Sequence, residues 1–348
     1  MIKLEISHPF IKTQRLETTS FLQIVGTDIK QKYYLSQLIT ASFTNHKYTA
    51  LETLSLDNYV PTLKLSDKKA SKSSGLYLKI TNRKELEEHL TLKKGSLLFE
   101  CVKLLHNQFE IEVELEIINS HFEKVVNVLN QQLKQFELSY QYDMKPFLFM
   151  DLLENMTLQF QENSQDIYLG CVEPKALFFE ILRILEKMST KITVPIILHI
   201  ENIESMLSLI DIKEVLEQYY DFSQKLNVYV INLANTESAV YMNEDVLTDT
   251  YIMAMNQIET LGNYEVIRNC IEQNYPSEYN EPQEICLMRL KRIIPYLLIP
   301  DGNQYIQNER DKIIWCILNE NLGYGIQKQI NHSKLNKLEE SFLNAQVY

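Results

Sequence analysis

The sequence predicts an α/β protein with a mostly parallel sheet, an inserted helical domain and a helical C-terminal extension. The main observation is a strand–helix–strand pattern in the second half of the chain. Residues 194–203 and 227–234 are mostly apolar, and residues 212–226 between them have the spacing of an amphipathic helix. Strands that are apolar on both faces are typical of parallel sheets covered by helices. With only 8 Gly and 9 Pro in 348 residues, long regular elements are expected.

The N-terminal part supplies the other expected strands. Residues 1–6 alternate apolar and polar side chains, and Phe21–Val25 is a second strand candidate. Lys32–Phe43 has apolar residues at helical spacing. A basic, serine-rich stretch, PTLKLSDKKASKSSG, then leads into a predicted strand at Leu76–Ile80.

Between residues 84 and 137 the pattern changes to helical stripes. One stripe runs from Leu97 to Leu105 and a second from Phe122 to Phe136. The intervening sequence EIEVELEI alternates like a strand, but no turn signal separates it from the helical patterns, so we interpret it as helix. This region predicts an antiparallel helical hairpin that projects from the core. A short strand at 166–170 and a helix at 176–188 follow.

The last hundred residues contain three more periodic segments, YEVIRNCIEQNYP, EICLMRLKRIIPYLL and RDKIIWCILNENLG. We find no internal repeat and no low-complexity tract. The predicted organisation is an α/β head formed by residues 1–83 and 165–245, an inserted helical domain at 84–164, and a helical C-terminal extension at 246–348.

Composition narrows the class of protein. Five scattered cysteines without C-x-x-C spacing indicate free thiols in a reducing cytosol and argue against a zinc site. There is no apolar signal core and no run of 18 apolar residues, so we expect a cytoplasmic protein with neither secretion nor a membrane span. The net charge of −12 argues against a protein that coats nucleic acid over its whole surface, but it allows a local basic face.

Two short motifs concern nucleotide chemistry. Gly26 and Lys32 have the spacing of a phosphate-binding loop, but Gln31 replaces the second glycine and Tyr33 replaces the small hydroxyl that would bind magnesium. Glu201 ends an apolar strand, as does the acid of nucleoside triphosphatases; a solvated loop acid is the alternative. The two half-motifs favour a degenerate P-loop-NTPase-like core related to ABC-type ATPase heads. We therefore expect no catalytic residues and no ATP hydrolysis.

A basic stretch is the main binding signal. Residues 64–94 contain nine Lys or Arg and four Asp or Glu, whereas residues 244–288 contain nine acids and one Arg. This asymmetry is typical of a DNA channel with an acidic outside, although a solvated loop would explain any single lysine. Aromatic residues do not interleave with these lysines, and no basic recognition helix appears, so neither base stacking nor sequence-specific reading is indicated. The candidate DNA-binding residues are Lys64, Lys68, Lys69, Lys72, Lys79, Arg83 and Lys84.

Acidic residues in the first helical region offer a candidate metal site. Glu110 and Glu114 are four residues apart, so they share one helix face, and their oxygen ligands suit calcium. A solvated helix face is the alternative, and no calcium-binding loop motif is present. His199 lies in a buried strand and is expected to be a hydrogen-bonded core residue. We find no nucleophile elbow and no nuclease signature.

Several stretches resemble one family. HPFIKTQRLETTSFLQIVGTDIKQKYY, HLTLKKGSLLFECVKLLHNQFEI, IILHIENI, NVYVINLA and RIIPYLL are similar to the corresponding parts of the type II-A CRISPR spacer-acquisition protein, in its long form. The resemblance covers nearly the whole chain and is diffuse, without one diagnostic motif. It implies a head similar to those of structural-maintenance and ABC ATPases, without nucleotide hydrolysis.

The resemblance also implies a function in antiviral defence. Members of the family form a ring-shaped homotetramer that takes up double-stranded DNA from its ends, and they act beside the CRISPR integrase and effector nuclease. Short forms bind calcium, so calcium is possible here although it is not expected to be required. The competing hypotheses are a divergent P-loop ATPase and a protein-interaction scaffold.

Overall fold

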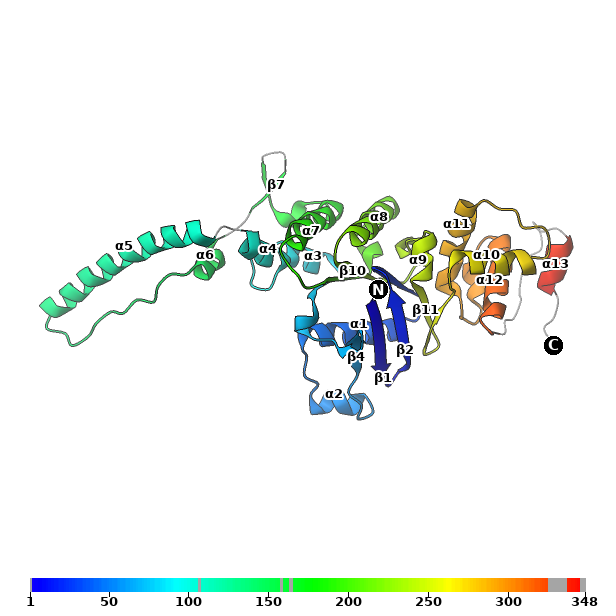
Figure 1. Cartoon of the computed structure of the whole chain (residues 1–348), viewed down its shortest axis with the longest axis horizontal. Coiled ribbons are helices and arrows are strands. Elements are labelled where there is room, and N and C mark those ends of the chain that lie inside the picture. Colours follow the sequence, from blue (N-terminus) through cyan, green and yellow to red (C-terminus); the bar gives the residue numbers. More distant parts are fainter. Residues whose placement is uncertain (1, 106–107, 157–158, 163–164, 325–336, 345–348) are drawn as a thin grey trace. The chain divides into compact units, whose positions relative to one another are not determined.

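The computed structural model describes residues 2–105, 108–156, 159–162, 165–324 and 337–344 (Figure 1). The chain divides into two compact units, which we describe separately. The first unit comprises residues 1–85 and 192–348, and the second comprises residues 86–191. Among the described residues, no helix is both long and apolar enough to cross a membrane.

A six-stranded sheet forms the centre of the first unit. Its strand order is β12-β11-β3-β10-β9-β6, and all neighbouring strands are parallel except the antiparallel pair β11–β12. The predicted α/β class with a mostly parallel sheet is therefore confirmed. The strands are β3 (Phe21–Val25), β6 (Leu76–Ile80), β9 (Ile196–Glu201), β10 (Val228–Ala234), β11 (Thr250–Ala254) and β12 (Gln257–Thr260).

A second, antiparallel sheet in the same unit was only partly predicted. Its order is β2-β1-β4-β5, and its apolar face joins α1 and the central sheet in one core, which includes Leu4, Leu16, Leu35 and Leu63. The opposite face carries charged residues. The elements are β1 (Ile2–His8), β2 (Ile11–Thr18), α1 (Ile29–Thr44), α2 (Ala50–Ser55), β4 (Thr62–Leu65) and β5 (Lys68–Lys69).

The C-terminal part of the first unit is mainly helical but begins with strands. The expectation of helix alone over residues 246–348 is wrong for 250–260, because β11 pairs with β3 and extends the central sheet. The apolar stripes of this part are buried within the chain itself, as Ile293, Leu297 and Ile313 show. The helices are α8 (Leu209–Lys225), α9 (Glu244–Thr248), α10 (Tyr264–Asn274), α11 (Gln283–Ile293), α12 (Glu309–Asn321) and α13 (Lys337–Asn344).

The second unit contains one long helix in place of the expected helical hairpin. The sequence EIEVELEI is helical, as predicted, but after α5 the chain returns along it as a segment without regular structure, residues 138–148, before the short helix α6 begins. Two asparagines of α5 hold the return segment: Asn119 and Asn130 each exchange two hydrogen bonds, of 2.7–3.1 Å, with the backbones of Phe147 and Tyr142 respectively. The elements of this region are α3 (Arg83–His89), α4 (Leu97–Leu105), α5 (Gln108–Gln135), α6 (Phe149–Asn155), β7 (Phe160–Glu162), β8 (Gln165–Ile167) and α7 (Pro174–Ser189).

Candidate functional site

The loop after β3 is short and closely packed. Gly26 ends the strand, and α1 begins at Ile29, so only two residues separate them. A Cβ atom on Gly26 would come within 2.2 Å of the Met253 carbonyl oxygen, which explains the glycine as a close approach of β3 to β11. A phosphate-binding loop needs a longer run of backbone N–H groups that curls around the phosphates. Here the helix begins before such a run can form.

The N-terminus of α1 already has its own anion. The Asp28 carboxylate caps the helix by accepting a hydrogen bond from the backbone N–H of Gln31 at 3.0 Å. Helix N-termini attract anions because their N–H groups are unpaired and the helix dipole is positive there. A phosphate approaching this end of α1 would meet the negative charge of Asp28.

Lys32 lies inside the protein. Its side chain is on the first turns of α1, it is buried, and its Nζ donates hydrogen bonds to the carbonyl oxygen of Ala234 and, at 3.0 Å, to Oδ1 of Asn235. Burial lowers the pKa of Lys32 to about 7, although the nearby Glu204, Asp28 and Glu201 favour its charged form. The lysine therefore links α1 to the end of β10 and does not reach into solvent.

Glu201 belongs to a buried polar network between α1 and the sheet. Its Oε1 lies 2.8 Å from Nε2 of His199, although the two atoms are not aligned for a hydrogen bond. Lys79 on β6 lies 3.7 Å from the same oxygen and donates to the Ser36 hydroxyl at 2.9 Å. Burial would raise the pKa of Glu201, but its contacts with His199, Ser36 and Lys79 hold it below the usual value.

The histidine of this network is a core residue, as predicted. His199 is fully buried, and its Nδ1 lies 2.8 Å from the Tyr77 hydroxyl, which in turn is 3.0 Å from Thr40 Oγ1 on α1. Burial lowers the pKa of His199, so the ring is neutral at physiological pH. The network can connect α1, β6 and β9, but it offers no exposed group for chemistry.

The candidate DNA-binding residues fall into two groups. Lys79 is turned inward to Ser36 and Glu201 and is only 19% exposed, so it is separated from the other lysines. Lys68 and Lys69 form the edge strand β5 and are exposed, as is Lys72 just after it. Lysines also protect an edge strand against unwanted pairing, which is a structural reason for their presence. We call Lys68, Lys69 and Lys72 the lysine edge.

The remaining DNA-binding candidates precede and follow the lysine edge in the sequence. Lys64 is opposite Lys69 in the sheet, and its Nζ pairs with Glu5 at 2.7 Å. Arg15 similarly pairs with Asp67 at 2.8 Å, so the charged face of this sheet is mixed and the lysine edge is its basic margin. Arg83 and Lys84 lie farther along the chain, in the first turn of α3.

The acidic metal candidates do not form a cluster. Glu110 and Glu114 are both exposed on α5. Across the residues that the structure describes, no group of three or more His, Cys, Asp or Glu side chains is arranged to hold a metal ion.

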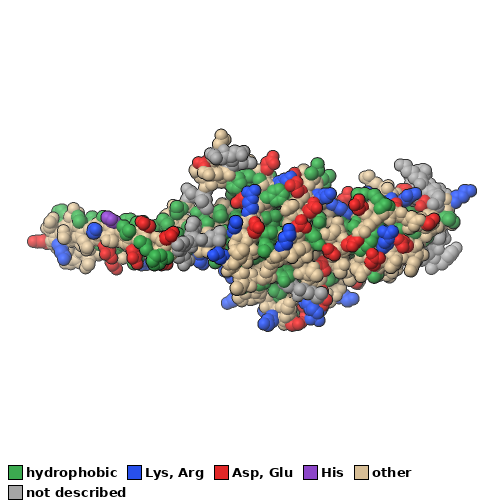
Figure 2. Space-filling view, turned by 45° about the horizontal axis from the view of Figure 1, so that its top comes forward, with side chains coloured by type: hydrophobic (Ala, Val, Ile, Leu, Met, Phe, Trp, Pro, Cys, Tyr) green, Lys and Arg blue, Asp and Glu red, His purple; other side chains and the backbone are tan. Residues whose placement is uncertain are grey.

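The long helix α5 instead presents an apolar surface. Figure 2 shows hydrophobic and acidic side chains beside one another along it. Successive residues of an α-helix are 100° apart, which places one set of apolar residues on a single line. This set, which we call the α5 stripe, is Ile111, Ile118, Phe122, Val125 and Leu129 on the helix, with Phe136 directly after its last residue. Ile118, Phe122 and Val125 are 38%, 47% and 56% exposed, and Phe136 is 75% exposed. The repeat was visible in the sequence, but its exposure was not.

Replacing Lys32 by methionine should remove a pH dependence of stability. In the folded protein the lysine loses its proton near pH 7, whereas the unfolded chain keeps it to about pH 10.5. The unfolded state therefore binds more protons between these values, and stability rises with pH. From pH 7 to pH 9, the stability of the unmodified protein should rise by about 2 kcal/mol relative to Lys32→Met. Urea unfolding at several pH values measures this difference. Lys30→Met, which removes an exposed lysine two residues earlier, is the matched control variant. If the stability difference between the unmodified protein and Lys32→Met did not change with pH, the buried position of Lys32 would not control its protonation.

One solved structure aligns with nearly the whole chain. The crystal structure of Stu0660 of Streptococcus thermophilus aligns with a TM-score of 0.86 and 24% sequence identity, over 98% of this chain and 99% of that one. A structure of the recombination mediator protein RecF-ATPrS in the RecFOR pathway aligns with a TM-score of only 0.37 and 12% identity, over 75% and 97% of the chains. That score is too low to indicate a shared fold. A search of curated proteins gives no match.

The family assignment rests on the sequence itself. A family model for CRISPR-associated protein Csn2, subfamily St, matches residues 6–344, which is nearly the whole chain. The Stu0660 structure supports the same fold over its full length. Csn2 proteins are involved in CRISPR adaptation. The chain therefore belongs to the Csn2 family of CRISPR-associated proteins, in its St subfamily.

Proposed function

We propose that this protein is a non-catalytic, sequence-independent binding protein for double-stranded DNA ends in CRISPR spacer acquisition. In this proposal it works as a homotetrameric ring through which the DNA passes, beside the CRISPR integrase and effector nuclease. The observation that carries DNA binding is the lysine edge, where Lys68, Lys69 and Lys72 are all exposed within five consecutive residues of a chain of net charge −12. Phosphate contacts by such lysines supply nearly all sequence-independent affinity.

The geometry near Gly26 supports the absence of ATP hydrolysis. The loop before α1 is too short to surround phosphates, Asp28 occupies the helix N-terminus, and Lys32 is bonded to Ala234 and Asn235. On this proposal the loop is a degenerate P-loop whose lysine has become a structural link. The alternative, a divergent P-loop ATPase, requires all three features to change when nucleotide binds.

Salt dependence tests the DNA-binding part of the proposal. The logarithm of the binding constant for linear duplex should fall with the logarithm of salt concentration, with a slope of about −0.9 for each phosphate contact. Replacing Lys68, Lys69 and Lys72 together by alanine should make the slope shallower by up to about 2.7, if each contacts one phosphate. Gel shifts or fluorescence anisotropy at several salt concentrations give the slope, and the same samples can be assayed for ATP hydrolysis.

A matched control separates local contacts from net charge. Lys187, Lys213 and Lys225 are exposed on other helices, and replacing all three by alanine changes the net charge equally. This control should keep the full slope. An equal loss in both variants would mean that overall charge, and not the lysine edge, controls binding. Magnesium-dependent ATP hydrolysis that disappears in Lys32→Ala would favour the ATPase alternative.

We also propose that the tetramer forms without calcium. In the described residues, Glu110 and Glu114 are exposed and have no third acidic or histidine ligand grouped with them. The α5 stripe offers an apolar contact between subunits in place of a metal bridge. The C-terminal stripes are buried within their own chain, so a contact of the extension with a neighbouring subunit would have to use its outer surface.

A further inference from the structure

Four aromatic rings from separate parts of the chain meet on the first unit. His8 is the last residue of β1, Phe10 lies in the turn that follows it, and Tyr33 and Tyr34 are on α1. The Tyr34 ring centroid lies 5.1 Å from that of His8, 5.0 Å from that of Phe10 and 6.0 Å from that of Tyr33. These distances are typical of aromatic pairs in contact. The sequence did not reveal this aromatic cluster, because its two pairs, His8 with Phe10 and Tyr33 with Tyr34, are more than twenty residues apart.

The cluster reaches from the core to the surface. His8 is buried, Phe10 and Tyr34 are half-buried, and Tyr33 is 58% exposed. Burial lowers the pKa of His8 to about 4, so its ring is neutral at physiological pH. The buried rings therefore hold Tyr34 in place, while Tyr33 presents its ring to solvent at the end of the series.

Positive charge lies beside these rings. The Nζ atom of Lys30 is 6.0 Å from the centroid of the Tyr34 ring, within the range of a cation–π interaction, and its side chain is exposed. Lys12 is exposed two residues after Phe10. The nearby acid, Asp28, is already engaged as the cap of α1. An aromatic surface with adjacent lysines suits a ligand that combines flat rings with negative charge.

We propose that the cluster binds unpaired nucleotides at the end of a DNA duplex, by stacking a base on Tyr33 while Lys30 and Lys12 face the backbone phosphates. Bases stack on aromatic side chains whatever their sequence, because every base has a π face. Within a duplex the base faces are covered by their neighbours, so an overhang is the part of a DNA end that fits this surface. The inference deepens the proposed function and rests on it for the nature of the ligand.

Duplexes that differ only at their ends test the inference. A blunt duplex and the same duplex with a single-stranded overhang carrying 2-aminopurine are titrated with the full chain. The overhang should bind at least about fivefold more tightly, which corresponds to the lower limit for one stacked base, and 2-aminopurine fluorescence should be quenched. Tyr33→Ala should abolish both the gain and the quenching, whereas Tyr33→Phe should keep them. Because Tyr33 is exposed, neither change should disturb folding.

The control is another exposed tyrosine in a stacked pair. Tyr305 is 65% exposed and its ring lies 5.5 Å from that of Tyr296, so Tyr305→Ala removes a comparable ring and should leave overhang binding unchanged. Equal binding of blunt and overhanging duplexes, or a gain that survives Tyr33→Ala, would overturn the inference and leave duplex binding intact. Overhang binding that depends on Tyr33, without any affinity for blunt duplex, would support the inference and contradict the proposed duplex function.

Discussion

Replacing Asp311 by alanine should lower the free energy of unfolding by about 3–5 kcal/mol, because it leaves a buried arginine with half of its charge partners. Asp311 is 1% exposed, and its two oxygens contact Arg289 Nη1 and, at 2.8 Å, Arg292 Nε. Arg289 also binds Glu281 through Nε and Nη2, at 2.5 and 2.7 Å. This network of two acids and two arginines connects α11, α12 and the segment before α11. Losing one of its acids should therefore destabilise the packing of these helices.

Urea unfolding of the variant measures this cost, and two comparisons interpret it. Glu272→Ala removes the acid of an exposed pair with Arg268 on α10, at 2.7 Å, and should cost about 1 kcal/mol or less. The double variant Arg289→Met with Asp311→Leu replaces the central pair by apolar groups and should recover much of the loss. If Asp311→Ala lowered the free energy of unfolding no more than Glu272→Ala does, the buried network would not stabilise the extension in the way that its geometry indicates.

Sequence patterns predicted the mostly apolar strands and the regularly alternating strand β1, and they missed elements without a clear periodic pattern. Phe21–Val25 and Leu76–Ile80 match β3 and β6, because short, mostly apolar runs mark the strands of a parallel sheet. The antiparallel strand β2 was missed because its alternation is irregular and its charged side chains resemble those of a loop. The predicted helical domain extended to residue 164, but the chain after α5 is held by hydrogen bonds to Asn119 and Asn130 that no local pattern reveals.

The candidate site shows a similar limit. From the sequence, Lys79 was predicted to bind DNA together with Lys68 and Lys69, because all three lie in one basic stretch. The direction of each side chain depends on the strand that carries it: β5 is an exposed edge, whereas β6 turns Lys79 toward Ser36 and Glu201. For Lys32 the sequence indicated only a degenerate phosphate loop, and the internal partners of its amine, Ala234 and Asn235, could not be predicted. Side-chain direction and competing internal partners are tertiary properties, so sequence spacing alone could not supply them.

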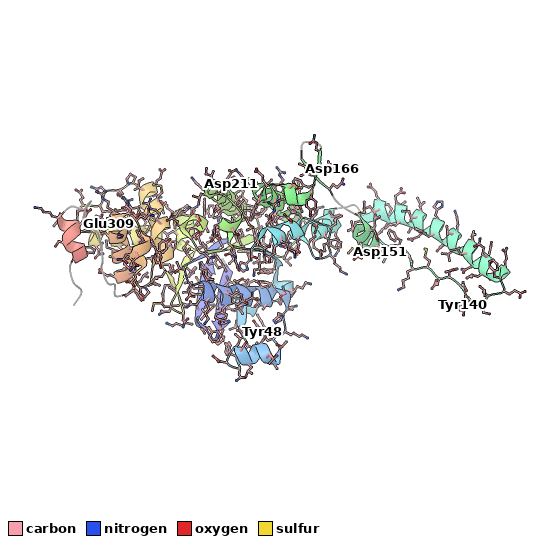
Figure 3. The ribbon with its side chains drawn as sticks, turned by 180° about the vertical axis from the view of Figure 1, so that it is seen from behind. Tyr48, Tyr140, Asp151, Asp166, Asp211 and Glu309 are labelled. Atoms are coloured by element: carbon pink, nitrogen blue, oxygen red, sulfur yellow. The ribbon has the colours of Figure 1, made fainter. Side chains whose placement is uncertain are left out.

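The α5 stripe should be the contact that assembles the proposed ring. Its apolar residues follow one line along this 28-residue helix, and all of them except the half-buried Ile111 are at least 38% exposed. Figure 3 shows the return segment beside α5, with Tyr140 near the tip. This segment is bonded to Asn119 and Asn130, which lie on a different side of the helix from the stripe. The acids of α5, including Glu110 and Glu114, lie mostly in its N-terminal half. Two copies that pair antiparallel through the stripe would keep these acids apart, which fits a two-fold contact between subunits.

Changing Ile118 and Phe122 together to glutamate should break this contact. Burying each side chain is worth roughly 1.5–3 kcal/mol, and a two-fold contact buries both residues twice. A loss of about 6 kcal/mol would weaken the subunit contact by about four orders of magnitude. Glutamate is a good helix former and both positions are exposed, so circular dichroism and thermal stability of the single chain should change little.

Light scattering at micromolar concentration reads out the assembly, with a matched pair of substitutions as the control. Asn127 and Gln131 are exposed on the side of α5 opposite the stripe, and changing both to glutamate adds the same charge. This control should keep the mass of four 41.0 kDa chains, with or without a chelator, whereas the stripe variant should give smaller species. If the stripe variant remained tetrameric, the ring would have to close through other surfaces. If it fell apart but bound linear duplex as tightly as the control, assembly through α5 would be unnecessary for binding DNA, and passage of DNA through a closed ring would be contradicted.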